Sequence, residues 1–171
     1  MKWLPLAILA LLAIVLQTTV VPWFRIGESG PDLLFVLAVH YALWGPWPDA
    51  GIAAWILGFV FSTQTDAPVG LHAFLYGAAA WGIMRIRQFV FREHPVTQFL
   101  VSLLFTFLVQ SCIWIGLHFL ATVRRSPGDV LGLCIVTAGY TAVCAPFIHA
   151  GLHRVGRWTG LRMGSRTAKF R

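Results

Sequence analysis

The chain has 171 residues, of which 58% are hydrophobic and 11% are charged, and its mean hydropathy is +0.75. A water-soluble domain of this length needs far more polar surface, so the composition excludes that class. The formal net charge of +7 comes largely from a basic tail at the end of the chain. We therefore predict a single transmembrane helical domain over 1–153 and a basic cytoplasmic tail over 154–171.

Six long apolar runs contain no Asp, Glu, Lys or Arg. A charged side chain costs at least about 2.5–3.5 kcal/mol at the centre of a bilayer, so charge is confined to the connections. A helix needs about 20 residues to cross the hydrocarbon, and the second and third runs are shorter than that. Three arrangements are open for these two runs. They extend into the flanking residues, they thin the bilayer locally, or they form a hairpin that re-enters from one face. We predict an all-α, six-helix membrane bundle with spans near 3–21, 31–45, 50–64, 69–87, 96–123 and 130–153.

The first run has the positive start of a signal peptide at Lys2. However, its apolar stretch is longer than that of a usual signal peptide, and no Ala-x-Ala-like site precedes Gln17. We expect it to be retained as the first span. Between the second and third runs, Pro46 and Pro48 remove backbone donors and restrict the residues before them. This predicts two short elements around a sharp turn.

The distribution of Lys and Arg predicts the orientation. Six spans with Lys2 inside put ten basic residues in the cytoplasm and three outside, as the positive-inside rule requires. The basic tail is explained by this topology signal and by contact with anionic lipid, with a cytoplasmic protein partner as the alternative. Nucleic acid is not an expected partner. The inside residues are Lys2, Arg85, Arg87, Arg92, Arg154, Arg157, Arg162, Arg166, Lys169 and Arg171, and the outside residues are Arg25, Arg124 and Arg125.

Polar residues inside the runs are the candidates for chemistry. A buried His without an acidic partner in its run is expected to be structural, with ligand or proton handling as the alternative. A metal site needs a third or fourth ligand at defined spacing, which the sequence lacks, and the cysteines behave as small hydrophobes. We predict no enzyme activity, metal or cofactor. The residues weighed are His40, His72, His118, His149, His153, Cys112, Cys134 and Cys144.

Polar side chains in and beside the runs look scattered, whereas a transporter would need them to converge on a cavity. These groups belong to Gln17, Thr18, Gln64, Gln110, Ser111 and His118. Trp55 and Trp114 fall deep in their runs and are expected to pack between helices. Small residues at four-residue spacing predict close helix packing within the chain, or docking of a partner's helix. Such pairs are Ala73 and Gly77, Ala78 and Gly82, Gly128 and Gly132, and Ala138 and Ala142.

The segment 31–92 is the most characteristic part of the chain. It contains Pro31-Asp-Leu-Leu-Phe-Val, Gly51-Ile-Ala-Ala-Trp-Ile-Leu-Gly58 and Asp66-Ala-Pro-Val-Gly-Leu-His-Ala73, and it closes with Arg85-Ile-Arg87. This order resembles the MreD family of bacterial rod shape-determining membrane proteins, which are small and have about six spans. The segment 16–23 is also similar to the end of the first span in that family. After Arg92 the resemblance is in hydropathy alone.

The resemblance implies a non-enzymatic scaffold of the cell-elongation machinery, which builds side-wall peptidoglycan at the inner membrane. The implied partners are an MreC-like bitopic protein and, through it, the MreB filament, the RodA glycosyltransferase and a class B penicillin-binding transpeptidase. The family is similar in fold to the six-helix substrate-binding subunits of energy-coupling-factor vitamin transporters. A second hypothesis is therefore a membrane subunit that binds a small molecule between the outer ends of its spans.

One position departs from the family pattern. An acidic residue commonly follows the second glycine of the third span by four positions, and here that place is Ser62, with Asp66 four residues later. Pro68 and Gly70 predict a compact turn that fixes the third helix against the fourth. We expect the structural or partner-binding motif to comprise Pro31, Asp32, Gly51, Gly58, Ser62, Asp66, Pro68, Gly70, His72, Gly77, Arg85 and Arg87, and the basic contacts to be Arg154, Arg157 and Arg162.

Overall fold

The computed structural model of the protein describes residues 3–25, 27, 29–65, 68, 70–89, 94–119 and 125–154. Over these residues the fold is all-α, and the prediction of six helices is confirmed. The helices are α1 (Trp3–Thr19), α2 (Leu33–Trp44), α3 (Asp49–Ser62), α4 (Leu71–Ile86), α5 (Pro95–Phe119) and α6 (Pro127–Arg154), and a short 3-10 helix, η1 (Val21–Phe24), follows α1.

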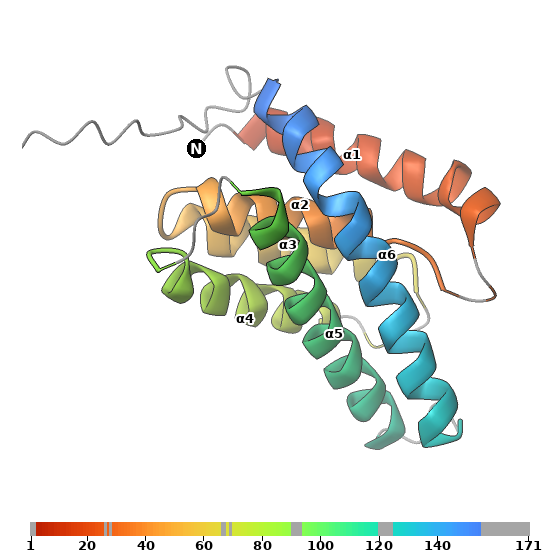
Figure 1. The fold of residues 1–171 in the computed structure, drawn as a ribbon. Coiled ribbons are helices and arrows are strands. Elements are labelled where there is room, and N and C mark those ends of the chain that lie inside the picture. The colour runs from red at the N-terminus through yellow and green to blue at the C-terminus, as the bar shows by residue number, and fades with distance from the viewer. Residues whose placement is uncertain are drawn as a thin grey trace, which may run out of the picture.

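Helix α2 lies at the centre of the molecule. Every residue from Leu34 to Leu43 is buried, as expected for a helix that is apolar on all sides. It packs against α1, α3, α4, α5 and α6. Figure 1 shows α2, α3 and α4 side by side as one layer, with α5 and α6 crossing this layer and extending beyond it. Helix α2 is therefore the core, and α3 and α4 keep one face open to the surroundings, where Trp55 and Phe74 are exposed.

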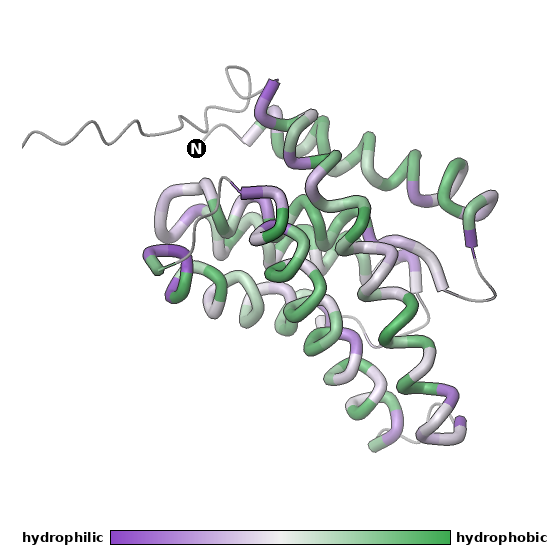
Figure 2. The backbone as a smooth tube through the Cα atoms, in the orientation of Figure 1, coloured by the Kyte–Doolittle hydropathy of each residue, from purple (hydrophilic) through white to green (hydrophobic). Residues whose placement is uncertain are grey.

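The helices differ in length in a way that matters for a membrane. Only α5 and α6, with 25 and 28 residues, are long and apolar enough to cross a bilayer among the described helices. Helix α2 has 12 residues and is therefore about 18 Å long, against a hydrocarbon core of about 30 Å. Figure 2 shows apolar residues along the middle of the helices and polar residues gathered near their ends. The bundle thus has the hydropathy of a membrane protein but contains short helices that do not match the full bilayer thickness.

Local chemistry explains where the helices begin and end. Gly45 ends α2 by donating its N–H to the carbonyl of Tyr41 at 2.7 Å. Gly70 has φ of +104°, a conformation that suits glycine, and α4 begins at the next residue. Helices α5 and α6 both begin with a proline, which has no N–H to leave unsatisfied at that position. At the described end of the predicted turn, Leu71 donates its N–H to the carbonyl of Pro68 at 3.2 Å.

The expectation that Trp55 packs between helices is wrong. Its side chain is 52% exposed and stacks on Phe59, with ring centroids 6.1 Å apart. The side of α3 that faces the core instead carries Ala53, Ala54 and Leu57. These smaller residues let α3 approach its neighbours closely, and this leaves Trp55 on the outer surface.

Candidate functional site

Asp32 joins three helices at the beginning of α2. Its carboxylate accepts the N–H of Phe35 at 2.9 Å, which caps α2, and it also accepts the hydroxyl of Tyr76 in α4. Its backbone N–H donates to the hydroxyl oxygen of Thr141 in α6 at 3.0 Å. Since Asp32 is only 7% exposed, these bonds replace the water that the buried groups lose. One residue thereby fixes α2, α4 and α6 relative to each other.

A small polar cavity lies directly beside Asp32. Its volume is about 140 Å³, which is room for a few water molecules at about 30 Å³ each. The side-chain oxygen of Gln17 is buried and has no hydrogen-bond partner among the described residues. The prediction that the polar groups are scattered is therefore wrong for Gln17 and Gln110. The lining consists of Gln17, Val21, Arg25, Gly30, Pro31, Asp32, Phe61, Gln110 and Thr137.

Gly58 allows α3 and α4 to touch through their backbones. A Cβ atom at this position would lie 2.5 Å from the carbonyl oxygen of His72 and 2.8 Å from the Cα of Ala73. No side chain fits there, so the glycine and the small residue opposite it determine the crossing. The ring of His72 lies beside Phe61, with centroids 4.9 Å apart, and Phe61 stacks on Tyr76 at 5.8 Å. Two motif residues, Asp32 and His72, therefore lie beside Tyr76.

Arg87 holds the opposite end of α2. One guanidinium nitrogen donates to the carbonyl of Ala42 at 3.1 Å and to that of Gly45 at 2.6 Å. The last carbonyls of a helix have no partner within the helix, and a cation is favourable there because of the helix dipole. Arg87 thus caps α2 from the end of α4. Arg85, two residues earlier, is exposed, and its guanidinium lies 4.8 Å from the centroid of the Trp81 ring.

Three histidines meet at the contact between α2 and α6. The ring centroid of His40 lies 5.1 Å from that of His149 and 5.3 Å from that of His153. His153 also contacts Trp44, with centroids 4.5 Å apart. Within the part of the chain that the structure describes, no three or more His, Cys, Asp or Glu residues form a group that could hold a metal ion. The arrangement is an aromatic contact that joins the two helices.

The remaining motif residues have separate positions. Ser62 is buried, and its hydroxyl donates to the carbonyl of Phe59 at 2.6 Å. This hydrogen bond stays within α3 and joins no other helix. A Cβ on Gly51 would meet only Met84, at 3.4 Å, and one on Gly77 only Trp55, at 3.6 Å. Pro68 and Arg154 are exposed and His118 lies near the end of α5. Asp66, Arg157 and Arg162 lie outside the described residues.

Sequence reasoning missed Tyr76 and Thr141 as parts of this site. Tyr76 lies in an apolar run, where its hydroxyl is a buried polar group that needs a partner. Thr141 lies four residues after Thr137, and its hydroxyl donates to the carbonyl of Thr137 at 2.8 Å. The only signal for either residue is a hydroxyl inside an apolar helix. That signal identifies the residue that needs a partner but not the partner.

These features define the chain as an all-helical membrane protein whose buried polar groups fasten its helices together. The family model of the rod shape-determining protein MreD matches residues 1–139, so the chain belongs to the MreD family. The match covers α1 to α5, the first part of α6 and the whole motif segment. No curated protein and no solved structure matched the chain. Membership of this family confirms the resemblance and assigns the chain a role in rod shape determination.

Proposed function

We propose that the protein is a non-enzymatic scaffold of the bacterial cell-elongation complex and binds the transmembrane helix of an MreC-like partner. The observation that carries this proposal is that three of the motif residues are used for internal packing. Asp32, Gly58 and Arg87 each join one short helix to another. A rigid core of this kind presents fixed outer faces, which is what a scaffold needs.

Helix α1 offers the face that best suits a partner helix. It contacts the rest of the bundle through Leu6, Ala10 and Ala13, which are buried. Its opposite side carries Leu4, Ile8 and Leu11, which are between 59% and 75% exposed. These residues recur at spacings of four and three, and a second helix packs along such a stripe. We place the MreC-like helix here, with the MreB filament, the RodA glycosyltransferase and the transpeptidase reached through it.

The same proposal includes the orientation. Helix α1 begins and α6 ends at one end of the molecule (Figure 1), and Arg85 and Arg87 lie near the end of α4. We assign this end to the cytoplasm because the positive-inside rule places most basic residues there. Both termini are then cytoplasmic in the inner membrane.

Depletion and crosslinking test this function. Depleting the protein from rod-shaped cells is expected to make them round. A photoreactive residue at Leu11 is expected to crosslink the MreC-like protein, whereas one at Phe74, an exposed residue of α4, is expected to crosslink lipid alone. Rods that persist after depletion, or equal crosslinking to the partner at both positions, contradict the proposal.

The polar cavity beside Asp32 favours a second candidate, a membrane subunit that binds a small molecule. Gln17 from α1 and Gln110 from α5 come together there with a carboxylate, as they would in a binding site. This candidate would have the fold that the family resemblance implies, that of the substrate-binding subunits of energy-coupling-factor transporters. We rank it second because a volume of about 140 Å³ is below the range of about 300–1,000 Å³ for typical ligand pockets.

A further inference from the structure

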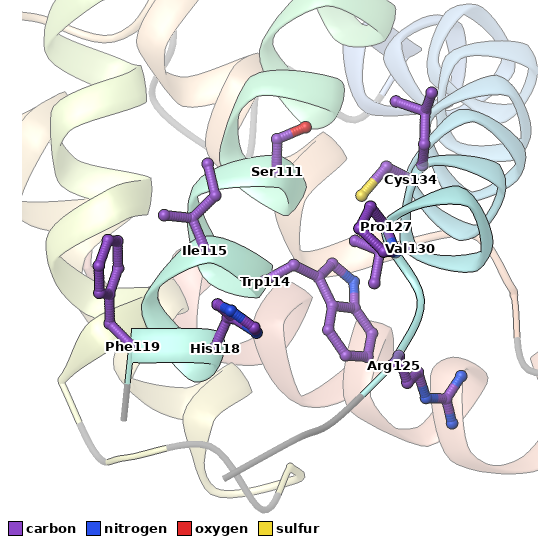
Figure 3. Close-up of a pocket in the computed structure, with 10 residues that line it drawn as sticks. Ser111, Trp114, Ile115, His118, Phe119, Arg125, Pro127, Val130 and Cys134 are labelled. Atoms are coloured by element: carbon purple, nitrogen blue, oxygen red, sulfur yellow. The ribbon is translucent and has the colours of Figure 1, made fainter. Parts of the chain in front are cut away.

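An apolar cavity opens between the end of α5 and the beginning of α6. Its volume is about 480 Å³, and Figure 3 shows Trp114 of α5 facing Val130 and Cys134 of α6 across it. Two of its lining side chains, Ile115 and Leu131, are 56% and 52% exposed. Both helices are long and apolar enough to cross a bilayer. The cavity therefore faces the hydrocarbon of a surrounding membrane.

A second cavity of about 480 Å³ continues along the same face of the two helices. It is lined by apolar residues of α5 and α6 alone, among them Leu104, Phe107 and Ile135. On α5, Leu104, Phe107, Ser111 and Ile115 follow one another at spacings of three and four, so they share a helix face. Leu104 and Phe107 line the second cavity, and Ser111 and Ile115 line the first. The two cavities therefore lie one after the other along the same face of α5, and we call them together the α5–α6 groove.

A cation lies at the outer end of this groove. Arg125 lines the first cavity two residues before α6 begins, and its guanidinium carbon lies 5.5 Å from the centroid of the Trp114 ring. A guanidinium matches the geometry of a phosphate, which it binds with two parallel hydrogen bonds. Trp is enriched at the level of lipid headgroups because its ring is apolar and its N–H is polar. The groove thus combines an apolar length with a guanidinium at one end.

We propose that the α5–α6 groove binds an anionic glycerophospholipid, with the phosphate on Arg125 and an acyl chain along the two cavities. Charge complementarity favours an anionic lipid over a neutral one, because a headgroup without net charge is attracted less strongly to the guanidinium. A transmembrane helix is about 10–12 Å across, so it would cover this face and not fill the two cavities. The inference is independent of the scaffold function, since it requires only that α5 and α6 cross a membrane.

Quenching of Trp114 fluorescence by brominated lipids tests the proposal. The full chain is placed in phosphatidylcholine vesicles that contain the same fraction of either phosphatidylglycerol or phosphatidylcholine with brominated acyl chains. The contribution of Trp114 is the difference between the wild type and Trp114→Phe. We expect about five-fold enrichment of phosphatidylglycerol near Trp114, the ratio that corresponds to about 1 kcal/mol for one Arg near a charged lipid.

Arg85 and Trp81 provide a matched control, because they form the same kind of pair at 4.8 Å and line neither cavity. Arg125→Gln is expected to abolish the enrichment of phosphatidylglycerol at Trp114, so that the ratio falls to about one. Arg85→Gln is expected to leave this ratio unchanged. Arg125→Lys, which keeps the charge, should retain part of it if Arg125→Gln does not fold. Equal quenching of wild-type Trp114 by both lipids overturns the proposal. So does the absence of quenching by either lipid, which is the result if a second copy of the chain covers the groove.

Discussion

The hydroxyl of Tyr76 donates a hydrogen bond to the carboxylate of Asp32, although the two residues are 44 positions apart in the chain. Tyr76 lies in the middle of α4, and Asp32 caps the beginning of α2. Both side chains are almost completely buried. This contact, together with the bond from Asp32 to Thr141, sets how the central helix sits against α4 and α6.

Tyr76→Phe is expected to lower the free energy of unfolding by about 1–3 kcal/mol, because the Asp32 carboxylate loses a buried donor. Thermal unfolding in mild detergent measures this. The control is Tyr41→Phe, because Tyr41 is equally buried and its hydroxyl has no partner among the described residues. That change should be neutral or slightly stabilising. Equal losses in the two variants would show that the hydrogen bond contributes nothing.

Gly58→Ala is expected to destabilise the contact between α3 and α4 by at least about 1–3 kcal/mol. The added Cβ would lie 2.5 Å from the carbonyl oxygen of His72, so the helices must separate. Gly77→Ala is the matched control on the same pair of helices, because its Cβ would only touch the Trp55 side chain at 3.6 Å. A melting temperature for Gly58→Ala that equals that of Gly77→Ala would be evidence against the backbone contact.

Arg87→Ala is expected to destabilise the protein by about 1–3 kcal/mol, since the carbonyls of Ala42 and Gly45 lose their donor. Arg85→Ala removes the same charge two residues away, so any effect on topology should be similar in both variants. Only the Arg87 variant should unfold at a lower temperature. Equal melting temperatures for the Arg87 and Arg85 variants would contradict the account.

Replacing Gln17 and Gln110 together with Leu separates the two candidate functions. The scaffold function predicts that depleted cells carrying this variant grow as rods, because the polar cavity is not needed to bind a partner helix. A small-molecule binder would lose its function, because the amides of its site are gone. Cell length-to-width ratio is the measurement, with the amount of protein in the membrane as the control for folding. Round cells at normal protein levels would favour the second candidate.

Replacing Arg154, Arg157 and Arg162 with Ala is expected to weaken assembly or to invert topology. Each basic residue near an anionic leaflet contributes about 1 kcal/mol to membrane binding and also acts as a topology signal. Reporter fusions at the two ends measure topology, and co-purification with the partner measures assembly. The matched variant with Lys at all three positions keeps the charge and should behave as the wild type. Unchanged behaviour of the Ala variant in both assays removes this role.

The helices and turns could be predicted because their causes are local. Gly70 and the absence of charge within each run are visible in a few consecutive residues, and the structure has the corresponding positive φ and helices. The family motif at 31–36 likewise marks the beginning of α2. Prolines and glycines mark helix ends because of their own backbone properties, so these ends can be read from the sequence.

The contacts between distant helices could not be predicted. Thr141 lies 109 residues from Asp32, and nothing in either segment selects the other. Gln17 and Gln110 share a cavity because the faces of α1 and α5 that carry them point toward each other. A run that is apolar on all sides does not reveal which face of its helix points inward. For the same reason Trp55 was misplaced. Packing, rather than local propensity, decides these positions.

Purification of the tagged full-length protein from its own membranes in mild detergent tests the central claim most directly. The account predicts that an MreC-like protein remains bound at comparable stoichiometry and that it is lost when the exposed face of α1 is changed by Ile8→Trp and Leu11→Trp. A preparation that carries no such protein but retains a small metabolite would contradict the scaffold function.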